Sequence, residues 1–160
     1  MRGHPWLADS RRIGTGTLRV LGMSVYEASL FALDNFDAAA FAAHPLVLEI
    51  HYRRALTGSA IADFSLAEMR RLAGNASLDE GSAERWGQFM RRAFPDVRSG
   101  DRITGHWSPA SGTTRFATNE GAPLELVDAG FGPRFFGIWL AAQTSRPQLR
   151  EQLLGSKAPT

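Results

Sequence analysis

The chain has 160 residues, of which 44% are hydrophobic and 21% charged, and its formal net charge is only +2. This length and balance indicate one soluble globular domain. Of the 18 basic residues only Lys157 is a lysine, and the arginines are scattered rather than gathered in the basic stripe of a nucleic-acid-binding protein. Cysteine is absent, which excludes disulfides and thiolate chemistry.

The N-terminal residues show no hydrophobic period. Residues 1–10 contain Gly and Pro, so we expect a mobile leader followed by a single domain over residues 11–156. The leader lacks the apolar run of a signal peptide, and no stretch of the chain reaches the ~18 apolar residues of a membrane-spanning helix. We therefore expect a cytoplasmic protein from the sequence as given, and a periplasmic one if a signal peptide lies upstream.

Three strands are predicted in the first third of the domain, over residues 12–20, 23–33 and 45–53. The connection before the third strand contains a predicted helical turn over residues 38–43. In the third strand, hydrophobic residues that face a core alternate with a row of polar ones. That row is Glu49, His51 and Arg53, and such a row is typical of the solvated face of a half-exposed strand.

Two helices are predicted after the third strand. The first spans residues 59–73 and ends at Gly74. The second opens near Ser77, where Ser77 to Glu80 fits a capping box, and Pro95 ends it.

The rest of the chain returns to strands and then to helices. Residues 102–107, 113–117 and 124–127 are predicted strands joined by hairpin-like turns. Residues 133–142 are apolar nearly all round, which predicts a buried central helix. A last helix begins near Ser145 with a second capping box. This order of elements predicts an α+β fold, in which a meandering antiparallel sheet carries its helices on one face.

No motif for a metal or a cofactor is present. The four histidines, His4, His44, His51 and His106, lack the spacing of metal ligands. Gly14-Thr15-Gly16 is not followed by Lys-Ser or Lys-Thr or by a helix, so it is not a phosphate-binding loop. We therefore expect neither a metal site nor a cofactor.

Glu68 is the one carboxylate on an apolar helix face. Ile61, Phe64, Met69 and Leu72 define that face, and Glu68 lies near its middle. A carboxylate in such a place is either paired with a cation or has a raised pKa. Two interpretations follow. Glu68 is structural, either paired with an arginine or brought to water by a rotation of the helix, or it is an acid–base or ligand-anchoring group.

Several stretches, in order and spacing, are similar to the chalcone isomerase-like family and span residues 13–155. They are Gly14-x-Gly16 with Leu18-Arg19, Val25-Tyr26-Glu27-Ala28-Ser29-Leu30, Thr57-Gly58-x-x-Ile61-Ala62 with Ser65 and Glu68-Met69, Phe94-Pro95-Asp96-Val97 with Gly100-Asp101, Phe135-Phe136-Gly137-Ile138-Trp139-Leu140 with Thr144-Ser145, and Leu153-Leu154-Gly155. The resemblance implies an open-faced β-sandwich, with a large antiparallel sheet, helices on one face and a ligand cleft between them.

Plant chalcone isomerases close a chalcone into a flavanone, and the resemblance implies where their site residues would lie here. The plant threonine corresponds to Leu21, the tyrosine to Ile61 and the asparagine to Glu68. The late hydroxyl is retained as Thr144 or Ser145. Because losing one donor to the developing oxyanion typically costs ~10²–10³ in rate, we expect no efficient chalcone cyclisation.

The plant arginine corresponds best to Arg19, with Arg11 and Arg12 as upstream alternatives. Ser65 lies beside Glu68 on the predicted helix and completes the predicted ligand site. If the protein is an enzyme, we expect Glu68 and Arg19 to be its catalytic residues.

Our main hypothesis is a protein that binds a small, largely apolar or amphipathic ligand between sheet and helices. A fatty acid would suit an arginine at the cleft, because a carboxylate prefers a bidentate cation. The alternatives are an isomerase or intramolecular lyase that uses Glu68 as acid–base with an arginine anchor, and a partner-binding protein with an apolar patch. We expect no nucleic-acid partner, and the sequence leaves the oligomeric state open.

Overall fold

The computed structural model describes residues 3–119 and 121–155, without the side chain of Asn75. Six antiparallel strands form one sheet in which every strand pairs with its neighbour in the chain. These strands are β1 (Arg11–Val20), β2 (Met23–Ala32), β3 (Leu46–Tyr52), β4 (Arg102–Ser108), β5 (Thr113–Thr118) and β6 (Leu124–Val127). The predicted meander is confirmed.

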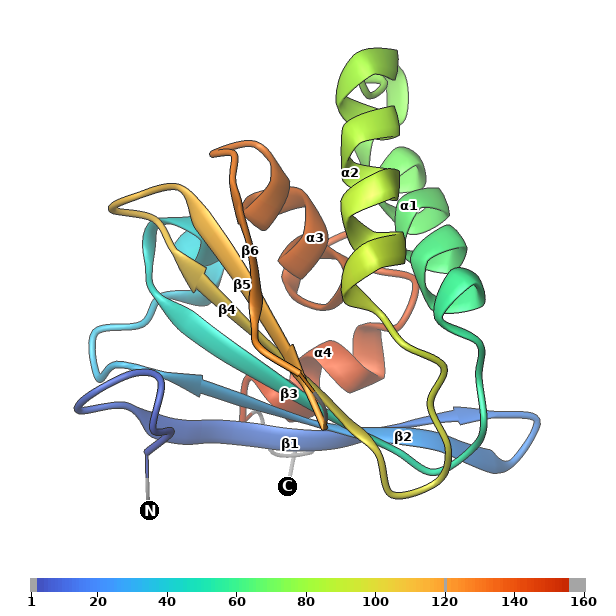
Figure 1. Cartoon of the computed structure of the whole chain (residues 1–160). Coiled ribbons are helices and arrows are strands. Elements are labelled where there is room, and N and C mark those ends of the chain that lie inside the picture. Colours follow the sequence, from blue (N-terminus) through green and yellow to red (C-terminus); the bar gives the residue numbers. More distant parts are fainter. Residues whose placement is uncertain (1–2, 120, 156–160) are drawn as a thin grey trace.

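The α-helices cover one face of the sheet, which we call the inner face (Figure 1). They are α1 (Gly58–Ala73), α2 (Glu80–Ala93), α3 (Phe131–Leu140) and α4 (Pro147–Leu153), with short 3-10 turns η1 (Ala38–Ala43) and η2 (Gly74–Ala76). The opposite, outer face carries no helix among the described residues. This is the α+β open-faced sandwich that the sequence predicts. None of these helices is long and apolar enough to cross a membrane.

Two predicted capping boxes are wrong. Ser77 has a φ of 47°, so its backbone is not the extended one that an N-cap requires. Asp79 caps α2 instead, and its carboxylate accepts from the backbone N–H of Ser82. At α4 the N-cap is Arg146, and the hydroxyl of Ser145 is turned away to Glu68.

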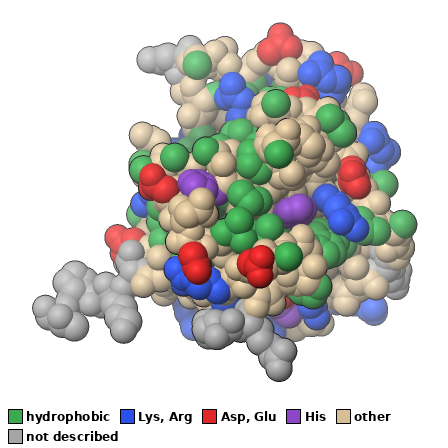
Figure 2. Space-filling view, turned by 90° about the vertical axis from the view of Figure 1, so that its left-hand side faces the viewer, with side chains coloured by type: hydrophobic (Ala, Val, Ile, Leu, Met, Phe, Trp, Pro, Cys, Tyr) green, Lys and Arg blue, Asp and Glu red, His purple; other side chains and the backbone are tan. Residues whose placement is uncertain are grey.

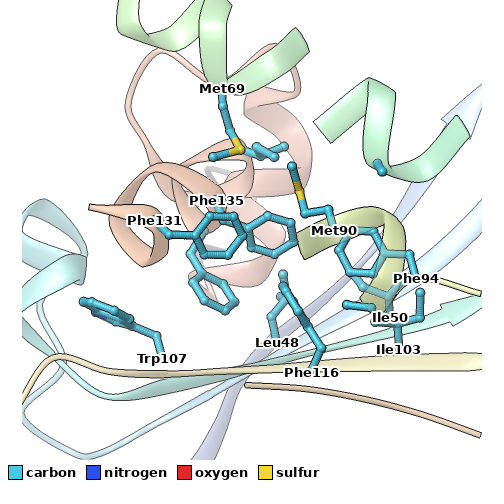
Figure 3. Close-up of a cluster of buried hydrophobic side chains, with 14 of the residues drawn as sticks. Leu48, Ile50, Met69, Met90, Phe94, Ile103, Trp107, Phe116, Phe131 and Phe135 are labelled. Carbon is cyan, nitrogen blue, oxygen red and sulfur yellow. The ribbon is translucent and has the colours of Figure 1, made fainter. Parts of the chain in front are cut away.

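Helix α3 lies at the centre of the core, as its apolar sequence predicts. Phe131 and Phe136 are fully buried, and the Phe131 ring stacks on that of Phe135 with centroids 5.5 Å apart. Aromatic side chains from α2, α3 and β5 thus meet above the inner face (Figure 3). Trp139, which belongs to the helix predicted to be buried, is only partly buried and borders a cavity.

The described part of the segment before β1 makes contacts with the sheet. From His4 onward the chain lies against the outer face, where the His4 ring contacts Phe31. Trp6 packs edge-on to His106 and lies under the guanidinium of Arg115. These contacts shield residues of the strands from solvent. The mobility of residues 1–10 stays a prediction.

Candidate functional site

A cavity of about 530 Å³ lies between the inner face of the sheet and helices α1 and α3. Its walls are mainly aliphatic and aromatic side chains, such as Leu48 and Ile50 from β3 and Phe135 and Ile138 from α3. A volume of this size, lined by apolar groups with a few polar ones, is characteristic of a small-molecule site. The cavity is therefore the candidate functional site.

Two buried tyrosines, Tyr26 and Tyr52, line the cavity, and burial raises the pKa of both. Tyr26 is the one that a tryptophan holds in place. Its hydroxyl oxygen accepts a hydrogen bond of 2.9 Å from the indole Nε1–H of Trp139. Burial raises the pKa of Tyr26 to about 12, although this bond and the charge of Arg146 oppose the shift. The phenol is therefore protonated at neutral pH, and its own O–H remains able to donate to a ligand.

Two arginines, Arg54 and Arg146, also line the cavity. The Arg146 guanidinium has no hydrogen bond or ion pair among the described residues, and its charge acts on Tyr26. Arg54 only approaches the Met23 sulfur, with Nη1 at 3.5 Å from Sδ. Next to an apolar cavity, a cation and a neutral O–H donor can together hold an acidic or carbonyl group.

Ile61 and Ser65 line the cavity from α1, where the predicted site places them. The Ser65 side chain is buried, and its hydroxyl donates to the carbonyl of Ile61 at 2.7 Å. The hydroxyl hydrogen is thus already used within the helix, which leaves only the Ser65 oxygen to accept from a ligand.

Glu68 lies on the same helix but is not part of the cavity wall. Its side chain is 13% exposed and pairs with Arg71, at 3.3 Å between Nε and Oε1. It also accepts a hydrogen bond of 2.9 Å from the Ser145 hydroxyl. Arg71 in turn donates to the carbonyl of Gln143 at 2.9 Å. This arrangement corresponds to the structural ion pair, which ties α1 to the segment between α3 and α4.

Thr144 is buried beside the cavity without lining it. Its hydroxyl donates to the carbonyl of Ile138 at 2.7 Å and accepts from the backbone N–H of Arg146 at 3.2 Å. Thr144 therefore positions the backbone that carries Arg146.

Arg19 and Leu21 do not line the cavity. Arg19 is exposed and donates to Ser24 at 2.9 Å, and Leu21 is 97% exposed at the tip of the β1–β2 hairpin. The strands turn at Leu21-Gly22, because Val20 pairs with Met23. The position that the resemblance assigns to the plant threonine, Leu21, therefore lies in the turn rather than in a strand of the sheet.

The two upstream arginines also lie elsewhere. Arg11 pairs with the exposed Asp34 at 3.0 Å, and Arg12 borders a hollow on the outer face.

Tyr26 and Arg146 are the site residues that the sequence reasoning missed. For Arg146 a signal existed, because a cation at a helix N-terminus opposes the macrodipole, which favours anions there. Tyr26 lies in the matched stretch around Val25 and on the inward face of its strand. A polar ring on that face was a second signal.

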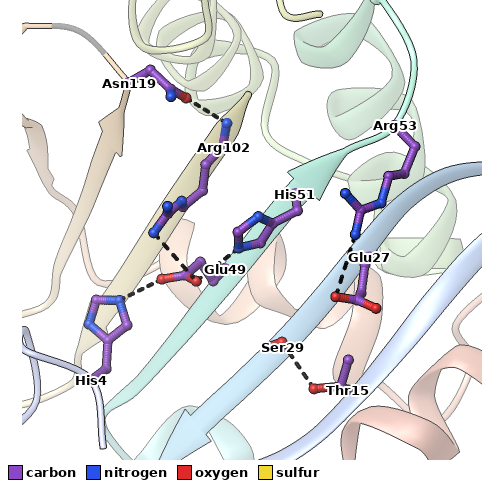
Figure 4. Close-up of polar contacts among 9 residues, drawn as sticks. All are labelled: His4, Thr15, Glu27, Ser29, Glu49, His51, Arg53, Arg102 and Asn119. Atoms are coloured by element: carbon purple, nitrogen blue, oxygen red, sulfur yellow. Dashed lines mark hydrogen bonds and ion pairs between the residues drawn. The ribbon is translucent and has the colours of Figure 1, made fainter. Parts of the chain in front are cut away.

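The polar row on β3 is not simply solvated. The Glu49 side chain is 14% exposed and accepts from His4 at 2.9 Å and from His51 at 3.1 Å, with Arg102 at 3.8 Å (Figure 4). The hydrogen bond from His4 is the largest effect that lowers the pKa of Glu49 to about 2, and His51 and Arg102 add to it against desolvation. The Glu49 carboxylate is therefore largely covered by its partners under the N-terminal segment, whereas Arg53 of the same row is exposed and lies near Glu27.

Seen from the side of the N-terminal segment, hydrophobic side chains gather at the centre, with histidines among them and both signs of charge around them (Figure 2). Despite these histidines, the described residues contain no group of three or more His, Asp or Glu side chains suited to hold a metal ion.

Comparison with known proteins agrees with this geometry. In curated sequences, the chain is 31% identical over 111 residues to an uncharacterised protein of Haemophilus influenzae, and the match covers 69% of this chain. It spans only 52%, about half, of that relative's length. Among solved structures, the fold resembles a fatty-acid binding protein of Arabidopsis thaliana with a TM-score of 0.70. That match covers 96% of this chain and 95% of the other, at 12% identity, so it concerns the fold alone.

The family model described as chalcone isomerase-like matches residues 13–155, which is nearly the whole described chain. Its extent coincides with the sheet, the helices and the cavity described above. The chain therefore belongs to the chalcone isomerase-like family.

Proposed function

We propose that this protein binds a small, largely apolar molecule with an acidic head group, such as a fatty acid, in the cavity between sheet and helices. The observation that carries the proposal is an apolar cavity of about 530 Å³ with Tyr26 and Arg146 together in its wall. The likeness in fold to a plant fatty-acid binding protein supports the same class of ligand.

The head group would bind at Arg146 and Tyr26. A carboxylate beside them receives a charge-assisted hydrogen bond from the guanidinium and a second bond from the phenol. The hydrocarbon tail would lie against side chains such as Ile50 and Ile138. Burying the tail there supplies most of the affinity, since each buried methylene contributes about 0.8 kcal/mol.

We propose further that chalcone cyclisation is not efficient. Leu21 lies at an exposed turn and Ile61 has no hydroxyl, so neither supplies a donor to the oxyanion of a chalcone. Incubation with 2′-hydroxychalcone should leave its visible absorbance decaying at the uncatalysed rate. Rapid conversion to the flavanone by the wild-type protein would refute this part of the proposal.

The alternative isomerase or lyase is less well supported. Glu68 would have to act as acid–base, but it lies outside the cavity wall and is held by Arg71 and Ser145. No observation favours it over the binding function.

Titration with oleate tests the binding proposal directly. Isothermal calorimetry should detect binding by the wild-type protein, and Arg146→Gln should weaken it by about ten-fold, because a charge-assisted bond contributes about 1.5–3 kcal/mol. Arg134→Gln is the matched control, since Arg134 is an exposed arginine on α3 outside the cavity wall. Equal affinity in Arg146→Gln and Arg134→Gln would contradict the assigned anchor, and no binding by the wild type would refute the function.

A further inference from the structure

Exposed apolar side chains gather at one edge of the cavity. The large hydrophobic side chains that are exposed among the described residues are Val20, Leu21, Met23, Phe64, Leu124 and Val127. The first four belong to the β1–β2 hairpin and to the adjacent side of α1, and Val20 and Phe64 themselves line the cavity. We call these four residues the rim patch. Figure 1 shows this hairpin projecting from the sheet beyond the base of α1.

The conformation of Leu21 is unusual for its residue type. Leu21 and Gly22 have φ values of 51° and 79° and form a two-residue loop between paired Val20 and Met23. Positive φ at both loop positions is the geometry of a type I′ turn, which strongly prefers Asn-Gly or Asp-Gly. A leucine here adopts a strained backbone and leaves its side chain 97% exposed. Neither turn chemistry nor core packing explains it, and such an outlier is a sign of function.

The charges around the rim patch are positive. Arg19 extends from the hairpin and Arg54 from the chain after β3, and neither has a carboxylate partner among the described residues. The carboxylate next to Phe64, that of Asp63, pairs with Arg91 of α2 at 3.1 Å. Apolar side chains flanked by unpaired arginines complement the surface of an anionic membrane.

We infer that the rim patch docks on an anionic phospholipid membrane, with the mouth of the cavity facing the lipid. Leu21, Met23 and Phe64 would enter the boundary between head groups and acyl chains, while Arg19 and Arg54 contact the head groups. This inference rests on the proposed function, because an apolar ligand held in a membrane could then enter the cavity without crossing water. Large exposed apolar patches mark membrane or protein contacts, and the adjoining lipid-type cavity selects the membrane.

Vesicle flotation of the wild-type protein and of a variant with one substitution in the turn, Leu21→Asn, tests the docking surface. The vesicles contain equal parts phosphatidylcholine and phosphatidylglycerol. Leu21→Asn should lower the partition constant between vesicles and water by about ten-fold, the loss expected for one leucine leaving an apolar phase. Asn-Gly is the preferred type I′ pair, so this variant should fold at least as well as the wild type. Val127→Thr removes another exposed apolar side chain, on β6, and should bind vesicles like the wild type.

The charge requirement gives a second readout. Arg19→Gln, high salt and vesicles of phosphatidylcholine alone should each weaken binding. The inference is overturned if Leu21→Asn and Val127→Thr bind alike, or if charge has no effect on vesicle binding. It is also overturned if the wild type does not float with vesicles but forms a dimer that Leu21→Asn dissociates, since the patch would then contact a second copy.

Oleate uptake separates this inference from the proposed function. In the absence of vesicles, Leu21→Asn should bind oleate like the wild type, but it should accept a fluorescent fatty acid from vesicles more slowly. Oleate binding without any vesicle binding would overturn the docking surface and leave the proposed function standing. Vesicle binding through Leu21 without oleate binding would overturn the proposed function and leave the docking surface standing.

Discussion

The two faces of the sheet exclude water in different ways. On the inner face, strand β3 presents Leu48 and Ile50 to aromatic side chains and to the cavity. On the outer face the same strand presents Glu49, which is only 14% exposed although no helix of the described residues covers it. His4, His51 and Arg102 satisfy its oxygens instead.

This difference shows that an alternating strand pattern identifies the two faces of a strand, but not how far the side chains on each face are exposed to solvent. Apolar packing is non-directional, so the inner face can leave space for a ligand and still be stable. A buried polar network depends on every partner, because an unpaired buried charge is costly. The inner face should therefore be most sensitive to lost volume, and the outer face to lost charge.

The largest effect should come from the inner face. Phe131→Ala should lower the free energy of unfolding by about 3–5 kcal/mol, because it empties a fully buried aromatic site. Denaturant unfolding measures this loss. Phe131→Leu retains much of the volume and should lose roughly half as much. A loss below about 1 kcal/mol for the alanine variant would show that α3 is not central to the core.

On the outer face, Glu49→Gln should cost about 2 kcal/mol at neutral pH, since it removes the charge that His4, His51 and Arg102 satisfy. Glu27→Gln is the control. Glu27 is 42% exposed and lies 3.8 Å from Arg53, so its loss should stay within about 0.5 kcal/mol. Equal costs at the two positions would mean that the outer face is simply solvated.

The same carboxylate predicts a pH dependence. Its pKa is lowered to about 2 in the folded protein, from 4.5 in an unperturbed glutamate. The folded state therefore holds the proton less tightly, and the contribution of Glu49 is fully present above about pH 4.5 and is lost as the pH falls towards about 2. Unfolding titrations over this range should show a smaller loss for Glu49→Gln than for the wild type. Parallel curves for the two proteins would contradict the assignment.

A smaller loss of stability is expected at the hydrogen bond between Trp139 and Tyr26 in the cavity wall. Trp139→Phe removes the 2.9 Å bond to the Tyr26 hydroxyl and should cost about 1 kcal/mol, a typical net value for one hydrogen bond. Tyr26→Phe and the double variant complete a thermodynamic cycle, whose coupling free energy should be about 0.5–1 kcal/mol. Full additivity would show that the bond contributes nothing to stability.

The smallest effect is expected where Glu68 of α1 meets Ser145 of the connection between α3 and α4. Glu68→Gln and Ser145→Ala should each cost about 0.5 kcal/mol, because both partners of Glu68, Arg71 and Ser145, are exposed and the pair is screened by water. Both variants should bind oleate like the wild type, because Glu68 does not line the cavity. A ten-fold loss of oleate affinity in Glu68→Gln alone would restore Glu68 as a ligand-anchoring group.

Local patterns in the sequence determined the order of the elements and the inward face of β3. Alternation over Leu46, Leu48, Ile50 and Tyr52 identifies a strand whatever the rest of the chain does. The apolar circumference of α3 likewise required burial, since no other environment suits it. With the family resemblance, this was enough to place Ile61 and Ser65 at the cavity.

Only the tertiary structure decided which charged and polar groups meet. Arg146 lines the same cavity as Tyr26 because α4 packs back onto β1 and β2, and no local period encodes this contact between segments far apart in the sequence. His4 reaches Glu49 for the same kind of reason. Leu21 shows the converse limit: a shift of one or two residues in a hairpin turn moves a side chain from the sheet to the tip, and the turn depends on φ rather than on hydrophobicity. Hydrophobic periodicity acts over a few residues, whereas polar sites are assembled by contacts between distant segments.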